Sequence, residues 1–596
     1  MLNPNSNRLN YGKIVSPPKG YWLDFAIGTT YSLNLDALID LSLSLSLSQG
    51  TDSNLVNDPV ILLDCLRDAS EKVMVFCENG RMKLDNKPHL FHTLLEDMII
   101  QVNNETIING NYASFHPKFW LLRFVGEENK IKYKLIVLSR NLTYDRSWDI
   151  SFTMCGQKTE EEIPDKNGAI IDFIKYLMDA SSKESAKTSK TKKMIQIIED
   201  LSHVKFELNS DVFDDYEFIV NGIDREGIQK SPLFNEKWNE LFIMSPFLTN
   251  TVIKGFNERY NNNSKAVLVS RRDSLRDLNS KNCSNFEVYS LKDEIIKGEY
   301  NISDENSLKR LQDIHAKMYL IEYEGNTELY LGSLNASNRA LDGNIEFMIR
   351  LNVRKGKFGI KQMIDDVFNG KIGDENNLFK KIENVEEMHE SENGEKSDLD
   401  INDIGRLNIK GNIVSKDDLY DIELTVVNYD EIKHKDKLQI KPLLVDNCID
   451  FSRNMKFEKV SKIDLSEFFI LKIENKEIII KIKIDGMPED RKDYIVSGII
   501  DSETKFLKLV AILLSDKHKS KYKKSGRVIP VNSHFTKNRV VLLPELYEKM
   551  LKAFLENPDK ILGLDFLIRN VDSKNIPEDF AELYNTFLRA RDKYGE

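Results

Sequence analysis

The chain has 596 residues, of which 41% are hydrophobic and 30% are charged, a composition that excludes a mostly disordered, collagen-like or low-complexity protein. The net charge of −11 does not indicate a nucleic-acid-binding protein, although an acidic molecule can still contain a basic cleft. Five scattered cysteines without CxxC spacing argue against a disulfide framework and against a thiolate zinc site: Cys65, Cys77, Cys155, Cys283 and Cys448.

The N-terminal region contains no pattern that predicts export or membrane insertion. Residues 1–20 lack the apolar core of a signal peptide. Residues 35–48 (LDALIDLSLSLSLS) are too few and too polar to cross a bilayer, so they predict a packed or amphipathic element. We therefore expect a cytoplasmic protein that does not act at a membrane.

Composition divides the chain into parts of normal domain size. Residues 180–193 are rich in Ser, Thr and Lys, residues 383–403 are acidic, and both stretches are interpreted as linkers or long surface segments because they lack apolar anchors. The division predicts two halves, an acidic linker, a β-rich accessory domain and a helical end: residues 1–190, 191–380, 381–405, 406–530 and 531–596.

Both halves alternate buried strands with helical patterns, which predicts α/β sandwiches. The predicted strands are residues 72–77, 118–125 and 133–139 in the first half, and residues 241–245, 265–270, 317–323 and 328–331 in the second. The third part reads as short strands with little helix between them, typical of a β-sandwich or barrel: residues 407–413, 422–427, 469–473, 477–484 and 494–500. From residue 544 the apolar period changes to 3.6, which predicts amphipathic helices at the end.

An internal repeat carries the candidate chemistry. Each half contains, in the same order and beside predicted strands, a histidine, a lysine, a serine, an asparagine and an acid. The first copy is His116, Lys118, Ser139, Asn141 and Asp149, and the second is His315, Lys317, Ser333, Asn335 and Glu346. One HxK occurs by chance in many chains, but the same five residue types twice in one order indicate a shared site.

The residue types of the repeat suit a phosphodiester. Residues i and i+2 of a strand point to one face, so the histidine and lysine of each copy project together. The cationic and neutral donors predicted to bind phosphate oxygens are Lys118, Lys317, Ser139, Asn141 and Asn335. No cluster of carboxylates accompanies them to hold a hard cation, so we expect chemistry without a metal or other cofactor.

Two histidines allow covalent catalysis with divided roles. One attacks phosphorus as neutral imidazole, and the other, protonated, gives its proton to the leaving oxygen. Asp149 and Glu346 are predicted to orient the imidazoles and to fix their tautomers.

These motifs resemble the HxKx4D and GSxN signature of the phospholipase D superfamily. The second copy follows it through Gly332, Ser333 and Asn335, with Glu322 at the place of the usual aspartate. The first copy is looser, with Arg123 at that place and Leu138 instead of the glycine, and is similar to the pattern of tyrosyl-DNA phosphodiesterase. The resemblance covers about residues 20–370.

The resemblance implies two like α/β/α sandwich halves with one active site at their interface, in addition to the β-rich and helical C-terminal parts. It also implies that His116 is the nucleophile and His315 the acid, although the residues themselves leave the reverse assignment open. The implied function is a metal-independent nuclease that cleaves DNA, or RNA, through a phosphohistidine. Relatives with this layout suggest prokaryotic antiviral defence with a helicase or ATPase partner. The alternatives are a phospholipid hydrolase or transferase, and an idle module that binds nucleic-acid ends.

Two further clusters are weaker candidates. Residues 517–527 (KHKSKYKKSGR) form a basic stretch that is most simply a solvated loop, and as a nucleic-acid contact it would use Lys519, Lys521, Lys523, Lys524 and Arg527. His89 and His92 have HxxH spacing, but without a third ligand in sequence we expect a structural or surface role for them.

Overall fold

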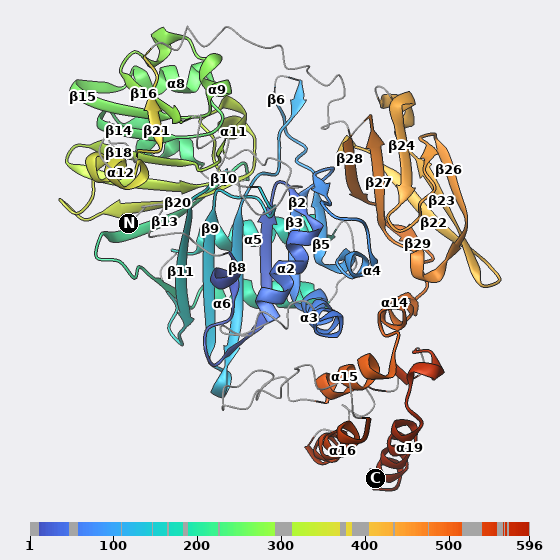
Figure 1. Cartoon of the computed structure of the whole chain (residues 1–596). Coiled ribbons are helices and arrows are strands. Elements are labelled where there is room, and N and C mark those ends of the chain that lie inside the picture. Colours follow the sequence, from blue (N-terminus) through green and yellow to red (C-terminus); the bar gives the residue numbers. More distant parts are fainter. Residues whose placement is uncertain are drawn as a thin grey trace.

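The computed structural model of the chain (Figure 1) describes residues 11–46, 58–108, 110–145, 147–163, 166–182, 189–223, 227–292, 313–369, 377–383, 404–432, 435–474, 476–514, 539–556, 564, 567–568 and 571–594. It is a mixed α/β structure with several sheets, which confirms the predicted α/β class. No helix within these ranges is long and apolar enough to cross a membrane.

The first sheet has seven strands in the order β12-β11-β9-β8-β1-β3-β5. The residues of the inner strand β1 alternate between two cores: Ala26 faces helices α2 and α3, while Phe25 and Ile27 face α5 and α6. The strands are β1 (Tyr21–Thr30), β3 (Val73–Glu78), β5 (Ile99–Val102), β8 (Phe119–Gly126), β9 (Ile131–Leu138), β11 (Ser151–Lys158) and β12 (Val204–Glu207), and the helices are α2 (Leu35–Ser46), α3 (Pro59–Lys72), α5 (Gly168–Ser182) and α6 (Ser189–Leu201).

The second sheet has eight strands in the order β13-β20-β19-β18-β14-β15-β16-β21. Helices α8 (Asn250–Asn257) and α12 (Ile360–Val367) contribute to the cores on its two faces. The strands are β13 (Phe213–Asn221), β14 (Trp238–Met244), β15 (Tyr260–Val269), β16 (Phe286–Leu291), β18 (Met318–Tyr323), β19 (Asn326–Gly332), β20 (Glu346–Val353) and β21 (Phe379–Lys381).

The two sheets share one strand order and one core. The run β12-β11-β9-β8-β1-β3-β5 corresponds strand for strand to β13-β20-β19-β18-β14-β15-β16, with the same parallel and antiparallel pairings. Phe119 and Phe173 from the first sheet region contact Phe347 of the second, with ring centroids 4.6 and 5.4 Å away. This common core holds the first residues of β8 and β18, which directly follow the two HxK motifs, in a fixed relation.

Two polar segments of the first part, in α2 and α6, are packed into the structure as helices although their composition is typical of exposed chain. The predicted boundary at residue 190 is wrong for the first sheet, which continues through α6 to β12. Lys190 lies in α6 and donates to the carbonyl oxygens of Val73 (2.9 Å) and Asp97 (2.7 Å), so its polar end is satisfied. In α2, Ser42 bonds the carbonyl four residues earlier, that of Leu38, at 2.8 Å, which allows the serine-rich run to be a buried helix.

The C-terminal part begins with two β-sheets around a separate core. One is four-stranded and consists of β22 (Ile409–Lys416), β23 (Leu419–Val426), β26 (Asn454–Ser461) and β29 (Ile484–Asp485). The other joins β24 (Leu438–Pro442), β25 (Ile449–Asp450), β27 (Phe468–Ile473) and β28 (Lys476–Lys481) to two short N-terminal strands, β2 (Leu33–Asn34) and β4 (Met82–Lys83). The two regions therefore share a sheet.

The helices of the C-terminal part begin earlier in the chain than residue 544, where they are predicted to start. The predicted strand over residues 494–500 is wrong: α14 (Arg491–Ile499) occupies this segment and buries Ile495, Val496 and Ile499, which have helical spacing. Further helices are α15 (Glu503–Leu513), α16 (Arg539–Glu556) and α19 (Glu578–Tyr594). The basic residues Lys519, Lys521, Lys523, Lys524 and Arg527 lie outside the described residues, as do residues 384–403 of the predicted acidic linker.

A buried ion pair joins α14 to the first sheet region. The guanidinium of Arg491 donates to the Glu96 carboxylate and to the Leu465 carbonyl (2.8 Å), and both charged side chains are at most 5% exposed. Ser466 also donates to Glu96 at 2.8 Å. Because each buried charge has its partners, the C-terminal region is held in a definite position next to the first sheet.

Candidate active site

Backbone hydrogen bonds tie each HxK motif to the segment that carries the acid of the opposite copy. The His116 amide donates to the Ile345 carbonyl at 2.9 Å, and Ile345 directly precedes Glu346. The His315 amide donates to the Trp148 carbonyl at 2.9 Å, and Trp148 directly precedes Asp149. The two copies of the motif thus meet at one place, with the acids exchanged between them.

The histidine–acid pairs are crossed. Nδ1 of His116 lies 2.9 Å from Oε2 of Glu346, and Nδ1 of His315 lies 3.1 Å from Oδ1 of Asp149. Each pair therefore joins the first repeat to the second. With Nδ1 donating to a carboxylate, Nε2 of each ring is left as the reactive nitrogen.

The two serines contact the acids. Ser139 Oγ donates to Asp149 at 3.0 Å, and Ser333 Oγ donates to Glu346. Each hydroxyl also accepts a backbone amide, that of Ile150 (2.9 Å) or Phe347 (3.0 Å). The structure thus gives Ser139 and Ser333 a role in holding the carboxylates, and the phosphate contact predicted for Ser139 stays a prediction.

The lysines and asparagines are the remaining polar groups of the motifs. Lys118 and Lys317 are fully buried, and each Nζ donates to the carbonyl of its own histidine, at 2.8 and 2.6 Å. The amide oxygens of Asn141 and Asn335 are buried and have no hydrogen-bond partner among the described residues. A side-chain amide can present either oxygen or NH2, so both groups are available to a polar ligand.

Burial dominates the electrostatics of this cluster. It lowers the pKa of His116 well below the ordinary value, and the charges of Lys118 and Lys317 act in the same direction. Burial and the charge of Lys317 lower the pKa of His315 to about 3, against the opposing effect of Asp149. Burial also lowers the pKa of Lys317 to about 7. Burial of the site therefore disfavours positive charge, and a bound phosphate anion would favour it.

The two carboxyl groups differ. Burial raises the pKa of Glu346 to about 8, although Lys118 and the hydrogen bond from Ser333 act against the rise. Burial also pushes the pKa of Asp149 upward, but the hydrogen bond and charge of His315 outweigh it and hold this pKa below its ordinary value. Asp149 is therefore the stronger anion of the two, and His315 has the partner that better stabilises an imidazolium.

Binding of an oxyanion at this site is expected to be coupled to proton uptake by the protein. A dianion beside Lys317 raises the lysine pKa above its free value of about 7, so affinity falls as pH rises from the free pKa towards the bound one. We expect the Kd of tungstate to rise about tenfold per pH unit for each proton taken up between pH 7 and 9. Calorimetry in buffers of different ionisation enthalpy measures both the Kd and the proton uptake.

Lys317→Met is expected to weaken tungstate binding and to flatten its pH dependence, whereas Lys410→Met, a control on β22 in the C-terminal sheet, leaves both unchanged. A wild-type Kd that stays constant from pH 7 to 9 would contradict this account of the site.

The residues at the two positions where the resemblance expects an aspartate make their contacts outside the site. Arg123 contacts Asp200 (2.9 Å) and Asp24 (2.5 Å) within the first sheet region. Glu322 lies on β18 and pairs across the sheet with Glu240 of β14. The site within the described part of the chain therefore consists of histidine, lysine, serine, asparagine and the two acids.

Sequence reasoning missed two neighbours of the crossed pairs. Asn344 donates to Oε1 of Glu346 at 3.2 Å and accepts the Ser114 amide at 2.9 Å, so it links the acid to the segment before His116. The Tyr31 ring lies 5.1 Å from the His116 ring, centroid to centroid. Tyr31 follows β1 in the run GTTYSL, and only its place at the end of a strand indicates in the sequence that it lies near the site.

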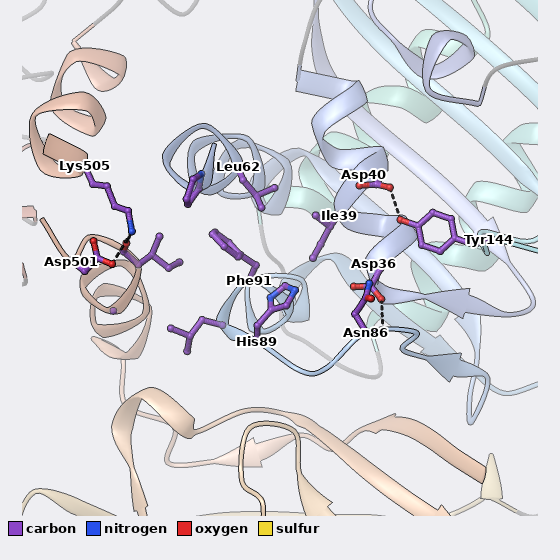
Figure 2. Close-up of a pocket in the computed structure, with 14 residues that line it drawn as sticks. Asp36, Ile39, Asp40, Leu62, Asn86, His89, Phe91, Tyr144, Asp501 and Lys505 are labelled. Atoms are coloured by element: carbon purple, nitrogen blue, oxygen red, sulfur yellow. Dashed lines mark hydrogen bonds and ion pairs between the residues drawn. The ribbon is translucent and has the colours of Figure 1, made fainter. Parts of the chain in front are cut away.

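Asp36 and His89 line a cavity of about 710 Å³ between the first region and the C-terminal helices (Figure 2), and the fully buried His92 contacts both of them. Nε2 of His92 lies 3.0 Å from Asp36, and Nδ1 of His92 accepts the His89 amide at 3.1 Å. The two imidazole rings stack 3.7 Å apart at 27°. A metal ion lies near the plane of each ligating ring, so stacked rings are poorly placed to share one. Asp36 supplies the third potential ligand that the sequence lacked, since its carboxylate and the two imidazoles have ligand atoms within 4.8 Å of one another. The stacking of the rings favours the structural role expected for His89 and His92.

No family model and no curated protein matches the chain. Among solved structures it is similar to phosphatidylserine synthase of Haemophilus influenzae Rd KW20, with 12% identity, a TM-score of 0.35, and coverage of 64% of this chain and 86% of that one. It is also similar to yeast tyrosyl-DNA phosphodiesterase, with 11% identity, a TM-score of 0.33, and coverage of 58% and 85%.

A third similar structure is the polyphosphate kinase of Porphyromonas gingivalis, with 11% identity, a TM-score of 0.30 and coverage of 59% of this chain. The match spans 46% of that kinase, less than half its length. At these scores the likenesses assign no activity to this chain, and the function has to be argued from the site.

Proposed function

We propose that this chain is a metal-independent phosphodiesterase of the phospholipase D superfamily, and that its substrate is nucleic acid, with DNA favoured over RNA. The observation that carries the proposal is the crossed arrangement: His116 with Glu346 and His315 with Asp149, beside two buried lysines. Two oriented imidazoles and two ammonium groups supply a nucleophile, an acid and charge stabilisation for phosphoryl transfer.

The reaction proceeds in two displacements. Nε2 of neutral His116 forms a bond to phosphorus while the bond to the leaving oxygen breaks, and protonated His315 gives its proton to that oxygen. Neutral His315 then takes a proton from water, whose oxygen attacks phosphorus, and the phosphorus–nitrogen bond breaks to release His116. Lys118 and Lys317 stabilise the charge of the non-bridging oxygens.

The difference between the two carboxyl groups supports this division of roles. Asp149, whose pKa is held low, opposes the fall in the pKa of His315, and the negative charge of a bound phosphate would raise that pKa further towards the imidazolium that His315 needs as an acid. Glu346, whose pKa burial raises to about 8, leaves His116 nearer to the neutral form that a nucleophile needs. A role in antiviral defence beside a helicase or ATPase belongs to the same proposal and rests on the sequence resemblance alone.

The test is cleavage of labelled single- and double-stranded DNA and RNA in EDTA. Hydrolysis of phospholipid vesicles is measured in parallel. We expect oligonucleotide cleavage that EDTA does not affect and that Lys317→Met lowers by about 10²- to 10³-fold, the usual cost of losing one charge-stabilising donor.

Hydrolysis of vesicles alone would replace the substrate class with phospholipid. Salt-sensitive oligonucleotide binding without cleavage of any substrate would favour the idle end-binding module.

A further inference from the structure

Three arginines from separate segments gather beside Glu78, at the end of β3. The Glu78 carboxylate accepts the amide of Phe115 at 2.7 Å, and Phe115 directly precedes His116. Burial raises the pKa of Glu78 to about 7, and the charges of three arginines limit that rise: Arg81, Arg406 and Arg339. Hydrogen bonds place the arginines in this region: Arg339 donates to the Tyr112 carbonyl, and Asn79, next to Glu78, donates to the carbonyl of Gly405, which precedes Arg406.

Arg81 reaches the site through an aromatic ring. Its guanidinium lies 5.1 Å from the centroid of Tyr31, and the same ring lies 5.1 Å from His116 and 5.7 Å from Nζ of Lys118. Tyr31 therefore stands between an arginine and the histidine–lysine pair. A flat ring beside cations is the arrangement that holds a base and its phosphate together.

The other two arginines meet at a second aromatic residue. Tyr112 belongs to the hairpin of β6 (Ile107–Ile108) and β7 (Asn111–Tyr112), and Figure 1 shows β6 projecting beyond the first sheet. Arg339, from α11 (Asn338–Asp342), donates to the Tyr112 carbonyl, and the guanidinium of Arg406 lies 3.7 Å from the centroid of its ring. Tyr112 is 40% exposed, so part of its side chain is open to a ligand.

Arg406 comes from the C-terminal part of the chain, at the start of the β-rich region. Asn79 donates to the Gly405 carbonyl at 2.8 Å, and Arg406 donates to the Asn104 carbonyl. A Cβ at Gly80, whose φ is +71°, would lie 2.9 Å from the Gly405 nitrogen, so the two segments approach closely at a position suited to glycine. These contacts place the Arg406 side chain beside the first sheet.

We propose that Arg81, Arg339 and Arg406, with Tyr31 and Tyr112, form a binding track for single-stranded nucleic acid that leads to His116. The inference rests on the proposed function and extends it in two ways: it names the strandedness of the substrate, and it gives the β-rich part a share in binding through Arg406. Arginines contact successive phosphates, and aromatic rings stack on unpaired bases.

The chemistry of the track favours a single strand over the alternatives. Stacking on the exposed ring of Tyr112 requires a base with an open face, which a duplex does not offer, while Tyr31 holds Arg81 beside His116. The nearby acid Glu105 lies 3.5 Å from Arg406 and is 73% exposed, so a polyanion can displace it at little cost. A lipid headgroup would occupy one phosphate position only, and would not use both aromatic residues.

The test is equilibrium binding by the full chain, measured by fluorescence anisotropy in the His116→Ala background so that cleavage plays no part. The probes are a labelled single-stranded 12-mer, the same 12-mer as a duplex, and a dinucleotide. Arg406→Gln and Arg339→Gln are each expected to weaken binding of the single-stranded 12-mer about tenfold and to lower the magnitude of its salt slope by about 0.7. Tyr112→Ala is expected to weaken it similarly, with little change in the salt slope.

Arg453→Gln is the matched control, since Arg453 lies in the same C-terminal region and pairs with Asp430. We expect it to leave binding unchanged, and thermal unfolding of all variants to match that of the parent. Dinucleotide binding is expected to be insensitive to the track variants. If the 12-mer binds tightly and none of the three substitutions changes its affinity, the track is overturned while the proposed function stays intact. Preference for the duplex, or no oligonucleotide binding at all, would also overturn it, and the latter would count against the proposed substrate class.

Discussion

Replacing His116 with alanine is expected to lower phosphodiester cleavage by about 10⁴- to 10⁶-fold, the range seen when a catalytic nucleophile is removed. The reason is that His116 supplies the nitrogen of the phosphohistidine in the proposed mechanism, whereas His315 serves the leaving oxygen. Binding is expected to remain, because Lys118 and Lys317 are both retained and a bound phosphate anion favours their charged forms. The measurement is single-turnover cleavage in EDTA together with a binding titration.

The corresponding change at His315 separates nucleophile from acid. With a p-nitrophenyl ester of thymidine phosphate the leaving group needs no proton, so His315→Ala is expected to form the phosphoenzyme but to hydrolyse it slowly. Acid-labile label should then accumulate on His315→Ala and not on His116→Ala. The opposite pattern would exchange the two roles, and His203→Ala, a histidine just after α6, serves as the control.

The local patterns of the sequence predicted the components of the site but not their partners. Short apolar runs are properties of single strands, so the α/β class follows from them. The HxK residues directly precede β8 and β18, so the strand argument for a common face does not apply to them. The exchange of Glu346 and Asp149 between copies depends on how two sheets pack through Phe119, Phe173 and Phe347, which no local pattern records.

The errors have a common cause in tertiary contacts. The polar segment near residue 190 was interpreted as a linker because its lysines lack apolar neighbours in sequence, yet Lys190 is satisfied by backbone carbonyls of distant residues. The apolar run at residues 494–500 fits either a strand or a helix, and packing of Ile495 and Ile499 decides for a helix. The contact between the Ser139 hydroxyl and Asp149 likewise depends on tertiary structure, and the sequence did not predict it.

The crossed pairing predicts opposite chemical consequences for the two acids. Glu346→Gln is expected to slow phosphoenzyme formation by about 10²- to 10⁴-fold with every leaving group, because it removes the carboxylate that holds His116 in its reactive tautomer. Asp149→Asn is expected to cause a loss of similar size with oligonucleotides, whose leaving oxygen needs a proton from His315. With the p-nitrophenyl ester, the effect of Asp149→Asn on this first step should largely disappear.

This comparison distinguishes the crossed arrangement from pairing within each repeat. If His116 were oriented by Asp149 and His315 by Glu346, Asp149→Asn would be the variant that slows the first step with every leaving group, and Glu346→Gln the one rescued by the p-nitrophenyl ester. Glu322→Gln is the matched control, because this carboxylate faces Glu240 on β14 although its sequence position suggests a catalytic aspartate. Rescue of Asp149→Asn but not of Glu346→Gln therefore requires that each half of the molecule completes the reactive histidine of the other.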